Sequence, residues 1–204
     1  MLSTMTTDAA NGRDRSATTR ERLLAAAVEA FATSGFAGTT TRDIASRAGM
    51  SPAAVYVHHA TKEELLFEIS RRGHRNAVEI IEKASQSASD PAERTRTMVA
   101  EFSRWHAVNS RVGRIVQYEF DALTPEHRAE IAEYRRAIEA LMREALEAGV
   151  AAEVMTVADL KGTALALLSL SIDLVRWYHP DGPTTPDEIA TLHGELALRM
   201  VGAA

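Results

Sequence analysis

The sequence predicts an all-α fold, and three observations support this. Helix start signals recur along the chain, each a Ser, Thr or Asp placed before an acidic residue or a proline. Apolar residues recur with the helical period, and the period-two alternation typical of β-strands is not found over any useful length. The 204 residues, 46% hydrophobic and 25% charged, suffice for a sizeable core.

The helix starts follow from capping chemistry, in which a side-chain oxygen accepts from a free amide of the first turn. Capping-box spacing occurs at Thr18 with Glu21, Thr40 with Asp43, Thr61 with Glu64, Thr156 with Asp159 and Thr185 with Glu188. A cap followed by proline occurs at Ser51-Pro52, Asp90-Pro91, Thr124-Pro125 and Thr185-Pro186. About nine helices are expected, at residues 18–34, 41–48, 52–59, 62–85, 91–109, 111–122, 125–148, 157–178 and 186–202.

The first two predicted helices each end at a glycine. Residues 18–34 carry an apolar stripe, and Gly35 follows it. The next helix ends at Gly49, and only Met50 and Ser51 separate it from the helix at 52–59. Two helices joined by a short glycine-containing turn meet at a steep angle, which is typical of a DNA-reading helix-turn-helix. An ordinary turn between two packed helices is the alternative.

The wider stretch, residues 18–69, resembles the DNA-binding domain of the tetracycline repressor (TetR) family. The matching segments are Arg20 to Phe31, Gly35-Phe36, Thr40 to Ala45, Ala48 to Ser51, Val55-Tyr56 and Thr61 to Leu66. The resemblance implies a homodimeric transcriptional repressor with two domains. Residues 18–62 would form the helix-turn-helix domain, and residues 63–204 would form a helical ligand-binding and dimerisation domain.

The resemblance also implies roles for residues of the helix-turn-helix. Tyr56 and Lys62 are expected to hold the DNA backbone, Thr40 to lie near a phosphate, and Ala53 and Val57 to face base edges. The full expected DNA-binding set is Thr40, Thr41, Arg42, Ser51, Pro52, Ala53, Ala54, Tyr56, Val57, His58 and Lys62. Structural alternatives are that Tyr56 belongs to the core, that Thr40 is only a cap, and that Lys62 is solvated.

Two segments, the pair His58-His59 and residues 1–17, each allow two interpretations. His58 and His59 stand where the family usually has two aromatic residues, so they are either structural or contact DNA. Residues 1–17 are polar and carry Arg13 and Arg15, which favours a flexible arm that is either disordered or follows the minor groove.

The charge distribution supports DNA as the partner of the N-terminal part. The net charge is −5, yet residues 1–62 hold seven basic and five acidic residues, and the remaining residues hold sixteen and twenty-three. A mildly basic head on an acidic body orients the head toward a polyanion.

The last two predicted helices are the expected dimer interface, as the resemblance implies. Residues 165–174 are apolar nearly all round, and a single stripe follows on the helix at 186–202. The expected interface set is Leu165, Leu168, Ile172, Ile189, Leu192, His193, Leu196 and Met200.

The intervening helices are expected to enclose a small-molecule effector. The residues best suited to line its pocket are Trp105, His106, Tyr118, Tyr134, Arg135, Arg176 and Trp177. Residues 118–128 and 175–182 resemble the subset of the family that senses acyl-CoA thioesters of lipid or sterol catabolism. Arg135 and Arg176 would then meet the coenzyme phosphates. A neutral hydrophobic drug or metabolite is the alternative, and it would need no arginine.

A helical enzyme and a protein-binding adaptor are the other classes weighed. The sequence has no cysteine, no Glu-x-x-His pair, no H-E-x-x-H and no glycine-rich phosphate loop, so no metal site, cofactor or catalytic residue is expected. There is also no secretory signal and no apolar stretch long enough for a membrane span. We therefore expect a cytoplasmic DNA-binding regulator that is not an enzyme.

Overall fold

The computed structural model describes residues 5–59 and 61–203, and their side chains at 18–57, 59 and 61–203. Within these residues every regular element is helical, so the predicted fold class is confirmed. The elements are α1 (Met5–Ser34), α2 (Thr41–Arg47), α3 (Pro52–His58), α4 (Lys62–Ser85), α5 (Pro91–Val108), α6 (Ser110–Tyr118), η1 (Phe120–Ala122), α7 (Pro125–Ala151), α8 (Leu160–Ile172), α9 (Leu174–Trp177) and α10 (Pro186–Met200).

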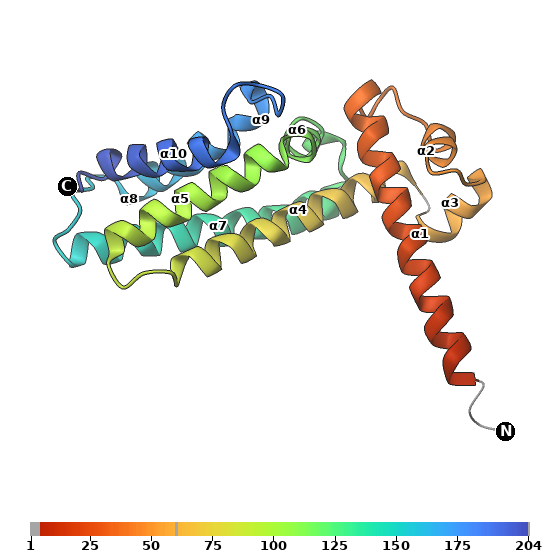
Figure 1. Ribbon diagram of the computed structural model, residues 1–204, viewed down its shortest axis with the longest axis horizontal. Helices are drawn as coiled ribbons and strands as arrows, with labels where there is room; N and C mark the ends of the chain where they lie inside the picture. The colour runs from red at the N-terminus through yellow and green to blue at the C-terminus, as the bar shows by residue number, and fades with distance from the viewer. Residues whose placement is uncertain (1–4, 60, 204) are drawn as a thin grey trace.

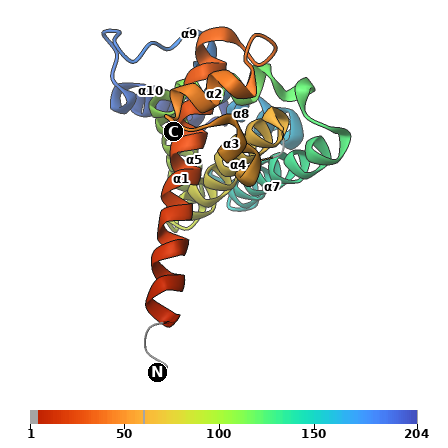
Figure 2. The same ribbon diagram turned by 90° about the vertical axis from the view of Figure 1, so that its right-hand side faces the viewer.

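The helices form a small N-terminal group and a longer body (Figure 1). Helices α1 to α3 lie together at one end, and α4 leads from them into the body. In the body α4, α5, α7, α8 and α10 run lengthwise, and α5 packs most extensively against α10. Figure 2 shows α1 projecting away from the rest of the molecule. Helix α6 contacts both α1 and α4, so it connects the two parts.

Most predicted caps are present in the structure. Thr40 and Thr185 each form a full capping box, with Asp43 and Glu188 respectively. The four predicted cap-proline pairs all begin helices, at α3, α5, α7 and α10. These signals worked because both partners of each hydrogen bond lie within one turn.

Two predicted helix starts are wrong. Helix α1 begins at Met5, so residues 5–17 continue the helix instead of forming an irregular arm, because this stretch has no proline and several good helix formers. The Thr18–Glu21 signal consequently lies inside α1. Thr156 does not cap α8, since its N–H donates to the carbonyl of Val201 at 2.8 Å; Asp159 is the cap.

Two predicted helices are also interrupted. The helix expected at 111–122 ends at Tyr118 and is followed by the short η1. At this break the carboxylate of Glu119 accepts from the N–H of Phe36 at 3.0 Å. The helix expected at 157–178 is broken at Asp173 into α8 and α9. Each break changes which side chains face the interior beyond it.

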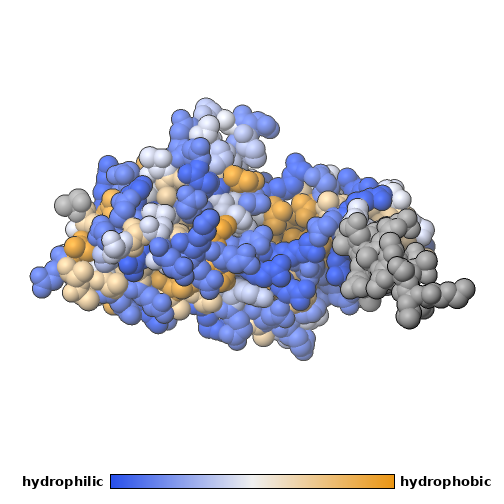
Figure 3. Space-filling view, turned by 60° about the horizontal axis from the view of Figure 1, so that its bottom comes forward, coloured by the Kyte–Doolittle hydropathy of each residue, from blue (hydrophilic) through white to orange (hydrophobic). Residues whose placement is uncertain are grey.

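The buried side chains form two main clusters. The first joins α1 to α4 with Ile115, Leu123 and Ile131 from the body, so the N-terminal helices share a core with α6 and α7. The second fills the space among α4, α5, α7, α8 and α10. The face in Figure 3 is mostly hydrophilic, with smaller apolar patches. No helix in the described ranges is long and apolar enough to cross a membrane.

Candidate functional site

The turn between α2 and α3 has the backbone geometry that the sequence predicts. Gly49 has φ +64°, a left-handed conformation that favours glycine, and Met50 N donates to the carbonyl of Ala45 at 2.9 Å. Ser51 then caps α3 by accepting from Ala54 N at 3.3 Å. Arg22 of α1 donates to the Ala48 carbonyl at 2.7 Å. The turn is therefore held both locally and by α1.

Among the described side chains of helix α3, one is buried in the protein and most of the others are exposed to solvent. Val55 is fully buried, whereas the exposed fractions of Tyr56 and Val57 are 57% and 80%. Ala53 is also exposed. The alternative that Tyr56 belongs to the core is therefore wrong. A short helix with small exposed residues at its start can approach the base edges of a major groove closely.

The start of α2 presents polar side chains beside this face. Thr40 and Arg42 are exposed, and Thr41 is partly buried. The Thr40 hydroxyl donates to the Asp43 carboxylate at 2.6 Å and accepts from Asp43 N. The backbone N–H of Thr40 also donates to this carboxylate, at 2.8 Å. The hydrogen bond from the hydroxyl, and then the one from the N–H, keep the pKa of Asp43 below its usual value.

Lys62 is bound to the protein itself. Its ammonium donates to the carbonyls of Phe36 and Thr39 at 2.7 and 2.9 Å and lies 4.3 Å from the centre of the Phe36 ring. The alternative of a solvated lysine is wrong. An ammonium has three N–H donors, so one more contact can be made toward DNA.

The two histidines and the N-terminus are described only in part. His59 is partly buried. The side chain of His58, residues 1–4 and the side chains of residues 5–17, including Arg13 and Arg15, lie outside the described atoms.

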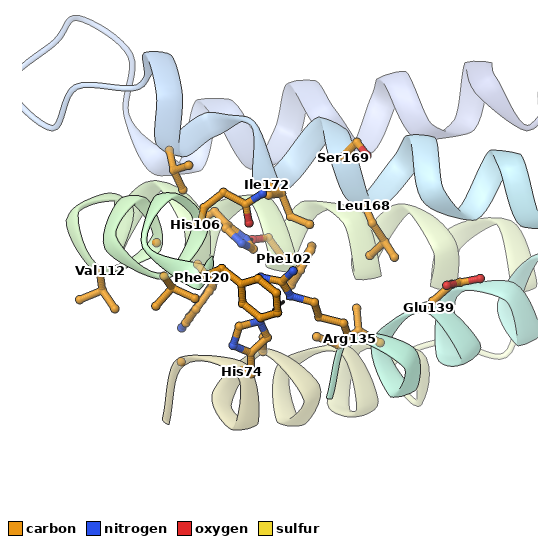
Figure 4. A pocket seen from close by; sticks show the side chains of 18 of the residues that line it. His74, Phe102, His106, Val112, Phe120, Arg135, Glu139, Leu168, Ser169 and Ile172 are labelled. Atoms are coloured by element: carbon orange, nitrogen blue, oxygen red, sulfur yellow. Dashed lines mark hydrogen bonds between the residues drawn. The ribbon is translucent and has the colours of Figure 1, made fainter. Parts of the chain in front are cut away.

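A cavity of about 500 Å³ lies in the body, enclosed by α4, α5, α6, α7 and α8 (Figure 4). Its walls are mainly apolar, with Phe102, Val116, Phe120 and Leu168 among them. Of the seven residues predicted to line an effector pocket, Trp105, His106 and Arg135 do so.

The other four predicted pocket residues lie elsewhere, and those predictions are wrong. Tyr118 is exposed and borders a second cavity beside α1. Tyr134 packs against the N-terminal core cluster. Arg176 is exposed and pairs with Asp173 at 2.8 Å, and Trp177 is 46% exposed. The break at Asp173 explains the errors at Arg176 and Trp177, because the helical phase of α8 does not continue through it.

Three polar side chains from three helices meet in the cavity. Arg135 Nε donates to His74 Nε2 at 3.2 Å, and its guanidinium lies 4.2 Å from the centre of the Phe120 ring. His74 Nδ1 lies 2.8 Å from the Ser70 carbonyl, and His106 Nδ1 lies 2.8 Å from the Phe102 carbonyl. A neutral imidazole with its proton on Nδ1 satisfies both contacts and leaves Nε2 as an acceptor.

Burial controls the protonation of these groups. Burial, opposed by the Ser70 carbonyl and assisted by the positive charge of Arg135, lowers the pKa of His74 to about 4. Burial also lowers the pKa of His106 to about 4. Both imidazoles are therefore neutral at pH 7. Burial lowers the pKa of Arg135 as well, but a guanidinium stays charged.

Sequence reasoning missed His74, and one signal could have found it. His74 shares the apolar face of α4 with Ala77 and Ile81, at i+3 and i+7. A histidine on such a face is either part of the core or faces a cavity, and its partner on α7 could not be read from spacing.

The predicted dimer set divides into outward and inward residues. Leu165, Leu192 and Met200 are exposed, and Leu196 and Ile172 are partly buried. Ile189, His193 and Leu168 are buried within the protomer, so their assignment to the interface is wrong.

The inward residues have their own partners. α10 packs on α5, and His193 Nδ1 lies 2.8 Å from Ser103 Oγ. Ser103 in turn lies 2.8 Å from Ser171 Oγ, and all three side chains are buried, so the contact is structural. Leu165, Leu168 and Ile172 also line the cavity.

Comparison with known proteins relates both parts of the chain to one family. The family model "Bacterial regulatory proteins, tetR family" matches residues 23–69, and "Tetracyclin repressor-like, C-terminal domain" matches residues 88–201. A crystal structure of a regulatory protein in the tetR family from Rhodococcus RHA1 is 41% identical, covers 91% of this chain and 98% of that chain, and has a TM-score of 0.86.

Two further relatives are forms of one regulator. The HTH-type transcriptional repressor KstR2 of Mycolicibacterium smegmatis is 28% identical over 187 residues, 89% of this chain and 90% of its own length. The structure described as ketosteroid transcriptional regulator KstR2 of Mycobacterium tuberculosis is 25% identical, covers 91% of this chain and 94% of that chain, and has a TM-score of 0.80.

Proposed function

The chain belongs to the TetR family of bacterial regulatory proteins, and from this premise we propose that it is a ligand-released transcriptional repressor. In the proposed cycle a homodimer binds a palindromic operator through two copies of α3. An effector that enters the cavity in the body then favours a conformation with lower operator affinity.

The observation that carries the DNA-binding part is the outward face of α3. Its first residues are small and mostly exposed, and Val55, the buried residue among its described side chains, fixes it on the N-terminal core. We assign base-edge contacts to Ala53, Ala54 and Val57, whose methyl groups suit thymine methyls, while Arg42 supplies hydrogen bonds. With few bidentate groups, part of the specificity would come from DNA shape.

Backbone contacts are assigned to the surrounding polar groups. Tyr56 has an exposed hydroxyl-bearing ring, and Lys62 has one N–H beyond its two carbonyl contacts. Thr40, Thr41, Ser51, Pro52 and His58 complete the proposed contact surface.

Helix α6 offers a physical link between effector and DNA. Val112 and Val116 line the cavity and also pack against the N-terminal core cluster, which contains Ile115 of the same helix. Directly after α6, Glu119 accepts from the N–H of Phe36 near the start of α2. We propose that a ligand pressing on the cavity side of α6 shifts the N-terminal helices and so changes the spacing of the two α3 helices.

The effector proposed here is a largely apolar molecule, with an acyl-CoA thioester of lipid or sterol catabolism as the first candidate. The cavity walls support an apolar acyl group, and the similarity to KstR2, described as a ketosteroid regulator, points to the same chemistry. The neutral hydrophobic ligand remains the second candidate. The guanidinium of Arg135 inside the cavity favours a ligand with an anionic group over a wholly neutral one, because a neutral ligand would leave that charge without a counter-ion.

A gel shift on the DNA upstream of the chain's own gene tests the DNA-binding part. We expect a complex with one dimer on a pseudo-palindromic segment, and loss of sequence preference in Val57→Asp, whose side chain would repel phosphate and contact no methyl group. Val108→Asp, which changes another exposed valine in the body, serves as the control. Equal binding of upstream and random DNA by the unaltered protein would contradict the proposal.

A further inference from the structure

Arg135 is a charged group in an apolar cavity that has no acidic partner. Twelve ion pairs occur among the described residues, and none includes Arg135. Glu139 lines the same cavity one turn along α7, but it forms no ion pair with Arg135 in the described chain and points away from it in Figure 4. Arg135 is partly buried. A cation that is partly removed from water is unfavourable unless it is paired, so its presence indicates a ligand that pairs with it.

The guanidinium is held in one orientation. His74 accepts from Nε, and the Phe120 ring covers the guanidinium at 4.2 Å (Figure 4). His74 is itself fixed by the Ser70 carbonyl. Because Nε is occupied, the two terminal nitrogens present the pair of parallel N–H groups that bind a carboxylate in a bidentate manner.

We propose that Arg135 forms a carboxylate subsite in the cavity, so that the effector is an apolar acid whose carboxylate lies on the two terminal nitrogens of Arg135. This inference rests on the proposed function, because it names the chemistry of the effector that the cavity takes.

The charge of the subsite selects a monoanion. His74 and His106 are neutral at pH 7 and add no positive charge to that of Arg135. Arg136 also lines the cavity, but its charge is paired with Glu133. One guanidinium balances one carboxylate, whereas the several phosphate charges of coenzyme A would stay unbalanced between apolar walls. The carboxylate can belong to a free acid or to the far end of a dicarboxylic acyl thioester, whose coenzyme would then lie outside the cavity.

Calorimetric titration of the full-length protein without DNA tests the subsite. The probes are three free acids of different shape, decanoate, 4-cyclohexylbutyrate and lithocholate, and the primary amide of each. Decanoyl-CoA and the CoA half-thioester of sebacic acid distinguish the two sources of the carboxylate. We expect at least one acid or the half-thioester to bind roughly 10- to 100-fold more tightly than its counterpart without the carboxylate.

Variants of Arg135 separate ligand binding from a structural role. Arg135→Gln is expected to abolish the preference for acid over amide, and Arg135→Lys to restore part of it. Arg143→Gln, an exposed arginine two turns along α7 that pairs with Glu147, is the matched control and should bind like the unaltered protein. Arg135→Met is expected to keep or raise the melting temperature of the unliganded protein, because it removes an unpaired buried charge, whereas a structural tie between α4 and α7 would lower it.

Three results would overturn the subsite: no carboxylate of the panel binds, the amides bind as tightly as the acids, or Arg135→Gln keeps the preference. Operator release is measured separately with the same probes. Arg135-dependent binding without release would contradict the proposed repressor cycle and leave the subsite standing. Release by decanoyl-CoA or an amide, unaffected by Arg135→Gln, would support the cycle and exclude the subsite.

Discussion

At the scale of single residues, Lys62 shows how a charged side chain can serve two purposes. The family resemblance predicts a phosphate contact, and the structure adds two hydrogen bonds to the carbonyls of Phe36 and Thr39. These bonds tie the start of α4 to the segment between α1 and α2, which sets the position of the helix-turn-helix.

Lys62→Ala is therefore expected to lower the free energy of unfolding by about 2 kcal/mol, since two carbonyls lose a charged donor. Urea unfolding measures this. If Lys62 also contacts phosphate, the slope of log affinity against log salt falls in magnitude by about 0.9 per lost contact. Lys83→Ala, an exposed lysine near the other end of α4, is the control. Unchanged stability would show that the carbonyl contacts contribute nothing.

The buried histidines make stability depend on pH. Their folded pKa values of about 4 lie below the ordinary value of 6.5, so the unfolded chain binds more protons between these limits. The stabilisation by neutral His74 and His106 is present above pH 6.5 and is lost as the pH falls toward 4, by up to about 3 kcal/mol for each.

Urea midpoints at pH 7 and pH 5 test this prediction. We expect a lower midpoint at pH 5 in the unaltered protein and a smaller difference in His106→Gln. His179→Gln changes an exposed histidine and should leave the difference as it is. A pH dependence equal in all three proteins would assign it to other groups.

At the scale of elements, α6 and α10 each have two faces with different roles. Helix α6 borders the cavity and also contributes to the N-terminal core cluster, and Glu119 follows directly after its last residue.

Glu119→Ala removes the acceptor of the Phe36 N–H. We expect faster hydrogen exchange at Phe36 and a smaller effect of any releasing ligand on operator affinity, measured by mass spectrometry and fluorescence anisotropy. Glu126→Ala, an exposed change at the start of α7, is the control. If hydrogen exchange at the Phe36 N–H is unaltered in this variant, Glu119 is not part of the proposed link.

The outward face of α10 is where we expect the dimer. Leu192 is 52% exposed in the protomer, so Leu192→Glu leaves the fold intact and places a charge where the partner would bury an apolar group. Sedimentation should show monomers with weak operator binding, and Leu196→Glu should act in the same direction. Thr191→Glu adds the same charge at a neighbouring exposed position and should stay dimeric if it lies at the edge of the interface. Dimers in both leucine variants would place the interface on another surface.

At the scale of the whole molecule, two parts of the chain depend on one another. The first core cluster combines α1 to α4 with Ile115, Leu123 and Ile131, so the boundary predicted at residue 62 does not separate two independent cores. A change in the cavity can therefore reach α3 through packed side chains. Packed interiors pass on displacement because they have little free volume.

Sequence reasoning was most successful where both partners of an interaction are close along the chain. Each cap, at Thr40, Ser51 and Thr185, forms a hydrogen bond to a residue three positions further along the chain, so residue types and spacing predict it. The left-handed conformation of Gly49 is likewise predicted from the backbone angles that glycine allows. The helical period then predicts the all-α class, and the short turn between two such helices, together with the resemblance of residues 18–69 to the TetR family, predicts the helix-turn-helix.

Only the tertiary structure decided which faces meet. Arg135 and His74 are sixty-one residues apart, and no spacing rule joins them. At the break after Tyr118, Glu119 accepts from the N–H of Phe36, and beyond the break at Asp173 the Val175 carbonyl accepts from Arg114. The second break directs Arg176 and Trp177 away from the cavity. Local backbone preferences are encoded residue by residue, whereas a cavity arises from the way several helices pack around one space, and that arrangement sets which side chains share it.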